Sequence, residues 1–350
     1  MSSSTLTNGP GTKSNGSSAS AQSERDEPIR ARLFDSNRED RLLDFDDALK
    51  VRIGSHQLLW IDVEGELERG QLHALAERFE LEEDTEAALA AERRGPSLEL
   101  HGRHFHLRVA AEPDPAHPED PTWLDLIAGP NVVISRHAGP LRFLEAINER
   151  IKADASIGEL DSAEFVASVL DGVVTSYHVA IDKIEDELDA HDARTLSRPI
   201  ANGDSITRLV EVRRRVTRLR RLLAAHREVF GTLSRPSFAR GVSERNPEVF
   251  LPVDSRFDAA LAAAESSREL VVSSFDVLMT RTAQRTNEVV RALTVITVLG
   301  LPATITAGFL GMNVIVPVSK DDPASFWIIT GLVILLEVVL IGIARMKHWI

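Results

Sequence analysis

Short apolar runs separated by turn residues fill the first half of the chain. The run at 58–63 indicates a buried strand, and the apolar spacing over 67–79 is typical of a helix. Further runs of the same kind predict additional strands at 98–100, 104–110, 123–127 and 132–135. Residues 29–155 are therefore expected to form an α/β domain built on a mixed sheet.

After residue 155 the pattern becomes wholly helical. An acidic helix is expected at 165–191, and after a break at 199–203 an arginine-rich helix is expected at 205–230. An acidic helix joined by a short loop to a basic one predicts an antiparallel hairpin with charges paired between the two helices.

A third helix is expected from about 253 to 310, because no proline or glycine occurs between Pro252 and Gly300. At a rise of about 1.5 Å per residue, this helix is far longer than a bilayer requires. Its first part is therefore expected to project as a stalk. The hairpin and the stalk together make up 156–285.

Two apolar segments dominate the C-terminal region, at 289–310 and 326–345, and a loop at 311–325 joins them. No charged side chain occurs from 292 to 310, and about 20 apolar residues suffice to cross a bilayer core. Both segments are expected to be transmembrane helices, which makes 286–350 a membrane domain.

The charges around these segments predict their orientation. Basic residues precede the first segment and follow the second: Arg281, Arg285, Arg291, Arg345 and Lys347. By the positive-inside rule both termini are cytoplasmic. The loop then lies at the outer mouth, where Asp321 and Asp322 are expected to concentrate cations.

Steps of three and four along the first segment place small and polar groups on one helix face. The stripe consists of Asn287, Val290, Thr294, Thr297, Leu301, Thr304 and Gly308. Such a stripe either packs against another helix or lines water. Threonine hydroxyls in the segment are expected to bond carbonyls one turn back. Pro302 cannot donate to Val298, which predicts a kink or a water contact.

The end of the first segment, Gly311-Met312-Asn313, carries a resemblance to a known family. Arg285-Thr286-Asn287-Glu288-Val289 precedes the segment, Pro302 lies within it, and a basic-aromatic tail ends the chain at Trp349-Ile350. In these features the sequence resembles the CorA family of divalent-cation channels. The resemblance implies a homopentameric funnel whose first spans line a central pore.

The resemblance also implies roles for individual residues. The selectivity filter is Gly311, Met312 and Asn313, and Asn287 faces the ion as well. Hydrophobic constrictions fall at Val290, Leu293 and Leu301, and the remaining lining is polar or small. Since Mg²⁺ gives up its waters reluctantly, a ring of neutral amide oxygens suits a hydrated ion.

Many members of this family close when cytosolic Mg²⁺ binds acidic residues between subunits. The matching stalk position here is Pro252, and Asp254 and Asp258 beside it are the candidate regulatory ligands. Glu337 lies within the second span, where a carboxyl group is costly. It either takes part in proton coupling or is a protonated or snorkelling side chain.

Composition and charge restrict the class of function. Residues 1–28 are rich in serine and glycine, which predicts a disordered tail without a signal peptide. The absence of cysteine excludes thiolate metal sites. A net charge of −13 argues against a nucleic-acid partner. No hydrolase or phosphate-loop motif occurs, so an enzyme is not expected.

Histidines at 101, 104 and 106 suggest either a metal site or an exposed strand face. We expect the exposed face, because no carboxylate or further histidine falls at ligand spacing in the sequence. Arg103 and Arg108 nearby also oppose a cation.

Three functions are consistent with the sequence. The first is a Mg²⁺ channel of the cell membrane, in which Mg²⁺ is the cargo and the candidate regulatory ion and no other cofactor is needed. The second is a zinc transporter of the ZntB type, with or without proton coupling. The third is a membrane-tethered scaffold without transport. No histidine or cysteine lies in the pore segment, which favours Mg²⁺ over Zn²⁺.

Overall fold

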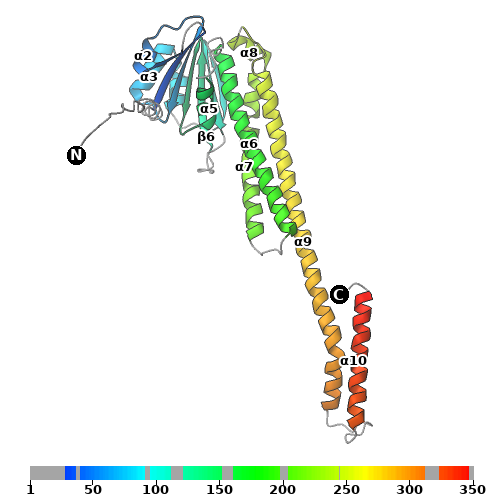
Figure 1. The fold of residues 1–350 in the computed structure, drawn as a ribbon. Helices are drawn as coiled ribbons and strands as arrows, with labels where there is room; N and C mark the ends of the chain where they lie inside the picture. The colour runs from blue at the N-terminus through cyan, green and yellow to red at the C-terminus, as the bar shows by residue number, and fades with distance from the viewer. Residues whose placement is uncertain are drawn as a thin grey trace, which may run out of the picture. The chain divides into compact units, whose positions relative to one another are not determined.

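The structure is a computed structural model, shown in Figure 1. It describes residues 28–36, 40–90, 95–111, 121–151, 161–197, 204–243, 245–311 and 323–346. The described residues of Met1–Glu187 and Glu211–Leu270 form one compact unit, and those of Leu188–Val210 and Val271–Ile350 form a second.

A seven-stranded sheet forms the centre of the first unit in the described residues. Its strands are β1 (Ile29–Asp35), β2 (Arg41–Leu43), β3 (Gln57–Glu64), β4 (Ser97–His101), β5 (His104–Ala111), β6 (Thr122–Gly129) and β7 (Val132–His137). The spatial order is β2-β1-β3-β7-β6-β5-β4. Strands β3 and β7 pair in parallel and the other neighbours are antiparallel, so the predicted mixed sheet is confirmed.

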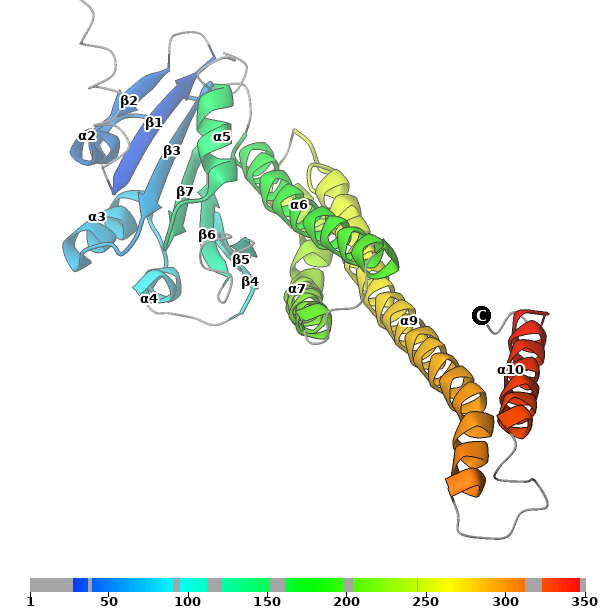
Figure 2. The same cartoon turned by 60° about the horizontal axis from the view of Figure 1, so that its bottom comes forward.

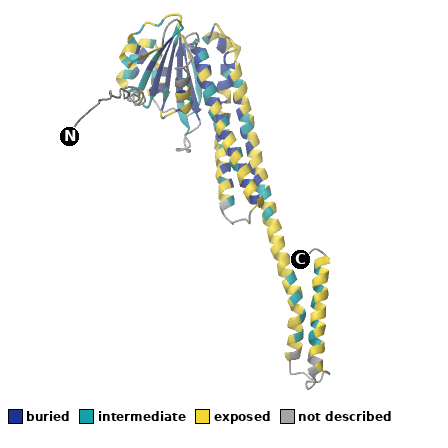
Figure 3. Ribbon diagram, viewed as in Figure 1, coloured by how far each residue is buried: buried dark blue, intermediate teal, exposed yellow. Residues whose placement is uncertain are grey.

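Three short helices cover one face of this sheet: α2 (Phe45–Lys50), α3 (Arg69–Phe79) and α4 (Glu83–Ala90). Ala48, Leu75 and Leu89 from these helices pack on Leu59 and Ile61 of β3 in one buried cluster. Alternate residues of a strand point to opposite faces, so the continuous apolar run of β3 can pack on both sides. Figure 2 shows these helices beside the strands, and Figure 3 shows the buried sheet.

The opposite face of the sheet packs on helix α6 (Ser162–Ser197), which follows α5 (Arg142–Ile151). The Phe165 ring lies 5.2 Å from the Trp60 ring and 6.0 Å from the Phe34 ring, measured between centroids. Gly172 gives α6 a close approach to Phe143 of α5, because a Cβ atom there would lie 2.8 Å from Phe143 Cδ2.

Helix α7 (Asp204–Leu233) follows α6, and both extend beyond the predicted ends. Between α6 and α7, Arg215 pairs with Glu187, as the charge pattern predicted. Other arginines of α7 pair with α9 instead, since Arg220 contacts Glu265 at 3.9 Å. The Phe230 and Phe257 rings stack at 4.2 Å within the same bundle.

Helix α9 (Leu251–Gly311) follows the short helix α8 (Pro236–Val242) and confirms the predicted long helix. Its C-terminal part belongs to the second unit, together with α10 (Pro323–Met346). Both helices contain stretches long and apolar enough to cross a membrane. In Figure 3 most residues in this part of α9 and α10 are coloured as exposed, and exposed apolar residues suit a lipid environment better than water.

Candidate functional site

The predicted stripe lies on one face of the C-terminal part of α9. All of its members are exposed in the single chain, and so is the predicted constriction residue Leu293; the members are Asn287, Val290, Thr294, Thr297, Leu301, Thr304 and Gly308. The half-buried residues of the same helix segment, by contrast, are Val295, Leu299, Pro302 and Thr306. At 3.6 residues per turn the two sets lie roughly 150° apart around the helix axis. The stripe is therefore nearly opposite the covered face of α9.

Helix α10 lies beside this part of α9 in Figures 1 and 2. Its half-buried positions recur at helical spacing and include Ile329, Val333, Glu337 and Leu340. Glu337 therefore shares a face with apolar residues that are partly covered. The stripe of α9 lies away from the half-buried face of that helix, so it is free to contact something outside this chain.

Threonine hydroxyls in the stripe bond within the helix, as the sequence predicted. The Oγ1 atoms of Thr294, Thr297 and Thr304 donate to carbonyl oxygens one turn back, at 2.8, 2.9 and 2.8 Å. Thr306 Oγ1 donates to the carbonyl of Pro302 at 2.8 Å. Figure 2 shows the last turns of α9 bending away from the preceding turns, and a proline inside a helix produces such a bend.

Gly311 ends helix α9 at the predicted filter. Met312 and Asn313 lie outside the described residues, as do Asp321 and Asp322 of the predicted outer mouth. No atom of the described residues lies within 4 Å of the Cβ positions at Gly308 and Gly311. A glycine lets another segment pack closely against the helix backbone, but no described segment of the same chain does so at these two positions.

The candidate regulatory residues Asp254 and Asp258 lie near the start of α9, and Arg227 of α7 contacts both. Arg227 Nη1 is 3.1 Å from Asp254 Oδ1, and Arg227 Nε is 3.2 Å from Asp258 Oδ1. Ser234 Oγ donates to the other Asp254 oxygen at 2.8 Å. A side-chain cation of the same chain therefore already neutralises the two carboxylates.

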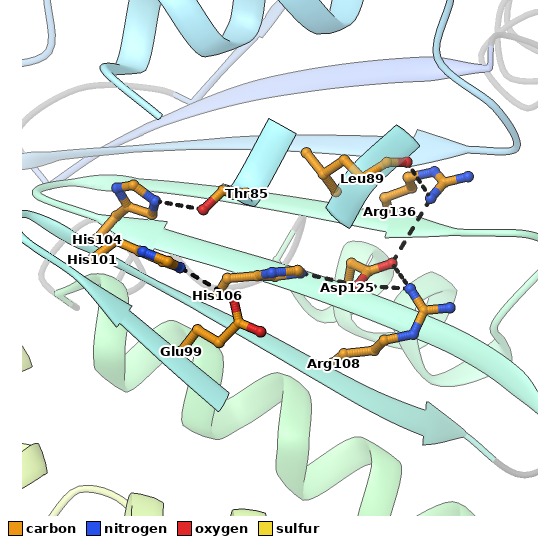
Figure 4. A network of polar contacts seen from close by, with 9 residues as sticks. All are labelled: Thr85, Leu89, Glu99, His101, His104, His106, Arg108, Asp125 and Arg136. Carbon is orange, nitrogen blue, oxygen red and sulfur yellow. Dashed lines mark hydrogen bonds and ion pairs between the residues drawn. The ribbon is translucent and has the colours of Figure 1, made fainter. Parts of the chain in front are cut away.

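A buried polar network on the sheet was wrongly predicted to be an exposed strand face. His104 and His106 of β5 are 5% and 1% exposed, and helix α4 covers them. His106 Nε2 lies 3.0 Å from Asp125 Oδ1, and Arg108 Nη1 lies 2.8 Å from Asp125 Oδ2 (Figure 4). Register pairing of β5 with β6 brings Asp125 opposite Arg108. Sequence spacing alone did not reveal this carboxylate.

The network continues toward the β4–β5 turn. His101 Nδ1 lies 3.0 Å from Glu82 Oε2, and the His101 and His104 rings stack at 5.3 Å. His104 Nε2 bonds Thr85 Oγ1 at 3.1 Å. Burial lowers the pKa of His104, and the neighbouring His101 lowers it further. Among the described residues, no three His, Cys, Asp or Glu side chains are placed to hold a metal ion.

A second buried chain of hydrogen bonds crosses the other face of the sheet. Trp60 Nε1 donates to Ser135 Oγ at 2.8 Å, and Ser135 Oγ donates to Asp62 Oδ1 at 2.5 Å. His137 Nε2 lies 3.3 Å from the same carboxylate oxygen. Burial opposes a charge on His137, but the hydrogen bond and charge of Asp62 outweigh it and raise the pKa of His137. Both networks join separate elements of the fold.

Comparisons with known proteins connect this fold to one family. The family described as "CorA-like Mg2+ transporter protein" matches residues 55–345. The "Cobalt/magnesium transport protein CorA" of Thermotoga maritima is 28% identical over 170 residues, which cover 48% of this chain and 48% of that relative. The chain thus matches about half the length of this relative.

Two further similarities cover more of the chain. The "Divalent cation transporter CmaX" of Pseudomonas aeruginosa is 27% identical over 235 residues, which cover 67% of this chain and 68% of CmaX. The solved structure of the CorA magnesium transporter of Methanocaldococcus jannaschii has a TM-score of 0.71 at 19% identity, covering 92% of this chain and 98% of that one. With a family match over most of its length, the chain belongs to the CorA-like Mg²⁺ transporter family.

Proposed function

We propose that the protein is a homopentameric channel that passes hydrated Mg²⁺ across the cell membrane. Five copies of α9 place their stripes around a central axis, and Gly311, Met312 and Asn313 form the filter at one end. Asn287 lies at the other end of the same stripe. The cation moves down its electrochemical gradient, to which the membrane potential contributes about 2.3 kcal/mol per charge per 100 mV.

The observation that carries this proposal is the position of the stripe on α9. Its threonine and glycine residues face away from the half-buried side of the helix and are exposed in the single chain. A face of small and hydroxyl-bearing side chains suits contact with another helix or a water-filled lumen better than it suits lipid. Rotation of identical chains about one axis covers this face with its own copies and leaves a polar lumen.

The donor groups of the pore segment favour Mg²⁺ as cargo. Between Asn287 and Asn313 the sequence offers amide and hydroxyl oxygens and contains neither histidine nor cysteine. Oxygen ligands and retained waters suit Mg²⁺, whereas protein Zn²⁺ sites prefer nitrogen and sulfur ligands. The names of the relatives include magnesium and cobalt, so Co²⁺ is the natural second ion to test.

The orientation proposed for the channel has both termini in the cytoplasm. Arg281, Arg285 and Arg291 precede the exposed segment of α9, and Arg345 ends α10. The positive-inside rule then places the loop between the helices outside the cell. Asp321 and Asp322 in that loop would raise the local concentration of cations at the outer mouth.

Tracer uptake into liposomes tests the proposal directly. Purified protein is reconstituted, and initial rates of Mg²⁺, Co²⁺ and Zn²⁺ entry are compared with and without an inside-negative potential. Potential-driven Mg²⁺ entry that Asn313→Ala reduces or makes unselective supports the channel. Zn²⁺ entry that is faster than Mg²⁺ entry and follows a proton gradient supports the zinc transporter instead.

Particle symmetry provides an independent measurement. Electron microscopy of the detergent-solubilised chain is expected to show fivefold rotational symmetry. Particles without rotational symmetry, together with no flux of any of the three ions, would identify a membrane-tethered scaffold.

A further inference from the structure

Helix α4 contributes few apolar side chains to the sheet that it covers. Of its eight residues, only Thr85, Ala88 and Leu89 are buried. In the first turn Thr85 Oγ1 lies 3.1 Å from His104 Nε2, and in the last turn the Leu89 carbonyl accepts a hydrogen bond from Arg136 Nη1 at 2.8 Å (Figure 4). The position of α4 therefore depends strongly on the polar groups beneath it.

Three histidines lie together under α4. His101 of β4 is paired opposite His104 of β5, and their rings stack at 5.3 Å. His106 lies two residues further along β5, so its side chain points to the same face of the sheet as that of His104. We call His101, His104 and His106 the histidine group.

The charged side chains around the histidine group come from five places in the chain. Within the described residues they are Glu82 just before α4, Glu99 of β4, Arg108 of β5, Asp125 of β6 and Arg136 of β7. Three carboxylates and two guanidinium groups give a charge of 2 − 3 = −1 when the histidines are neutral. One proton on the histidine group balances that charge.

His101 is the histidine placed to take this first proton. Its Nδ1 lies 3.0 Å from Glu82 Oε2, and its Nε2 lies 3.3 Å from Glu99 Oε2. Both ring nitrogens of a protonated His101 would therefore face a carboxylate, which is a favourable arrangement for an imidazolium ion. The first proton is thus compatible with a closed α4.

Further protons have no comparable place. His106 Nε2 already contacts Asp125, and its buried Nδ1 has no hydrogen-bond partner among the described residues, so a proton there would lack an acceptor. A charge on His104 would lie beside the first turn of α4, where the helix dipole is positive. Burial lowers the pKa of His104, and the neighbouring His101 lowers it further.

We propose that α4 is a lid that is closed over the histidine group at neutral pH and opens in mildly acidic solution. While the lid is closed, a second or third proton finds no unbalanced negative charge, whereas water can solvate the protonated rings once α4 has moved away. The open form therefore takes up more protons below about pH 6.5, where exposed histidines become charged. Falling pH shifts the population toward the form that binds more protons, which is the open one.

Two exposed ion pairs near α4 do not explain such a response. His73 of α3 lies 3.7 Å from Glu86 of α4, and its protonation would strengthen this contact as the pH falls. Its side chain is 73% exposed, so this opposing effect is small. Arg103 at the β4–β5 turn lies 3.8 Å from Glu80, and both side chains are exposed.

Hydrogen exchange measured by mass spectrometry tests the lid in the full-length wild-type protein. Protection of the α4 amides is compared at about pH 7.5 and about pH 5.5, on either side of the usual histidine pKa, after correction for the intrinsic exchange rate. Helix α3 on the same face of the sheet is the internal reference. Protection of α4 should fall several-fold at the lower pH, while that of α3 changes little.

Substitutions then identify the groups that are responsible. His104→Gln with His106→Gln replaces both buried rings by amides that do not titrate, and the loss of α4 protection at low pH should disappear. His104→Gln alone should reduce it. His73→Gln is the matched control, because it removes a titrating ring next to α4 that is exposed, and it should keep the full loss.

Three results would overturn the inference. One is equal α4 protection at both pH values in the wild type. Another is an equal loss in α3 and α4, which would show that the surrounding unit opens as a whole. The third is a loss that persists in the His104→Gln/His106→Gln variant. The wild-type comparison decides the first two even where a variant does not fold.

Discussion

The imidazole of His226 accepts a hydrogen bond at Nε2 from the backbone nitrogen of Ala110, 2.8 Å away. Its Nδ1 lies 2.7 Å from the carbonyl oxygen of Leu222, to which it donates. The Tyr177 hydroxyl donates to the carbonyl of the same Ala110. Strand β4 pairs with β5 only as far as Arg108, so these two side chains satisfy the backbone of β5 where its neighbour strand has ended.

The hydrogen bonds of His226 to Ala110 and Leu222 require a neutral imidazole ring. The free energy of unfolding therefore depends on pH. Burial lowers the pKa of His226 below its usual value, so the folded protein holds fewer protons there than the unfolded chain. The contribution of His226 is complete above about pH 6.5 and is lost as the pH falls toward the lowered pKa of the folded state. We expect the thermal midpoint of the full-length protein to fall over that range.

Two variants separate this effect from other titrating groups. His226→Phe leaves the Ala110 amide without an acceptor and should cost about 1–3 kcal/mol at pH 8. Its stability should then be less dependent on pH below 6.5 than that of the wild type. His226→Gln keeps an acceptor that does not titrate. At pH 8 its free energy of unfolding should lie between those of the wild type and His226→Phe. An unchanged pH profile in both variants would contradict this role for His226.

Replacement of Gly172 even by alanine is predicted to destabilise the protein. The added Cβ would lie 2.8 Å from Phe143 Cδ2 and 3.2 Å from Phe143 Cβ. Overpacking of this kind costs about 1–3 kcal/mol, which outweighs the roughly 1 kcal/mol that alanine gains over glycine in a helix. Gly241→Ala in α8 is the control. In the part of the chain that the structure describes, nothing lies within 4 Å of its Cβ position, so this substitution should be neutral or stabilising. Chemical denaturation of both variants measures the difference.

Removal of Arg227 is expected to create affinity for Mg²⁺ at Asp254 and Asp258. In the structure the guanidinium supplies the positive charge between these carboxylates, and Arg227→Ala leaves both without it. Mg²⁺ should then raise the thermal midpoint of Arg227→Ala more than that of the wild type, since ligand binding to the folded state stabilises it.

Arg220→Ala is the matched control for this measurement, because Arg220 contacts a single carboxylate at 3.9 Å. An equal response to Mg²⁺ in Arg227→Ala, Arg220→Ala and the wild type would remove Asp254 and Asp258 as regulatory ligands.

Leu301 belongs to the exposed stripe, and its replacement by serine should increase ion flux several-fold. A hydrophobic ring in a pore resists wetting, and a hydroxyl at the same position admits water. Ile296→Ser is the control at a position of α9 outside both the stripe and the half-buried face. Equal increases in liposome flux for both variants would show that the effect arises from helix stability and not from the pore.

Glu337→Gln is expected to leave the pH dependence of flux unchanged. Glu337 shares the half-buried face of α10 with Val333 and Leu340, whereas the proposed pathway runs along the exposed stripe of α9. Initial uptake rates are measured at a series of external pH values in both proteins. A loss of proton dependence in the variant would instead assign proton coupling to this carboxyl group.

Local periodicity made much of the fold predictable from the sequence. The strand at 58–63 and the helix at 67–79 correspond to β3 and α3, and the long helix from 253 corresponds to α9. Their apolar spacing repeats over enough residues to distinguish a period of two from a period of 3.6. The hydroxyl bonds of Thr294 and Thr297 were predictable as well, because they depend only on the residue one turn back.

Contacts between distant segments were not predictable in this way. His106 is buried under α4, and its partner Asp125 on β6 lies 19 residues further along the chain. An acid inside the otherwise apolar stretch Leu124-Asp125-Leu126-Ile127 was the available signal for a buried partner. The contact of Arg227 with Asp254 likewise depends on how α7 packs against α9, which no local pattern specifies.

The hydroxyl groups of Thr294, Thr297 and Thr304 each point their hydrogen back into the helix. Outward these three hydroxyls offer only oxygen lone pairs, so a species passing the threonine section of the proposed pore meets hydroxyl acceptors without hydroxyl donors. This section of the lumen attracts the hydrogens of the water shell around a cation and offers an anion no hydroxyl hydrogen. These threonines would then contribute to discrimination by the sign of charge through their bonds to the backbone, although none of them is ionised.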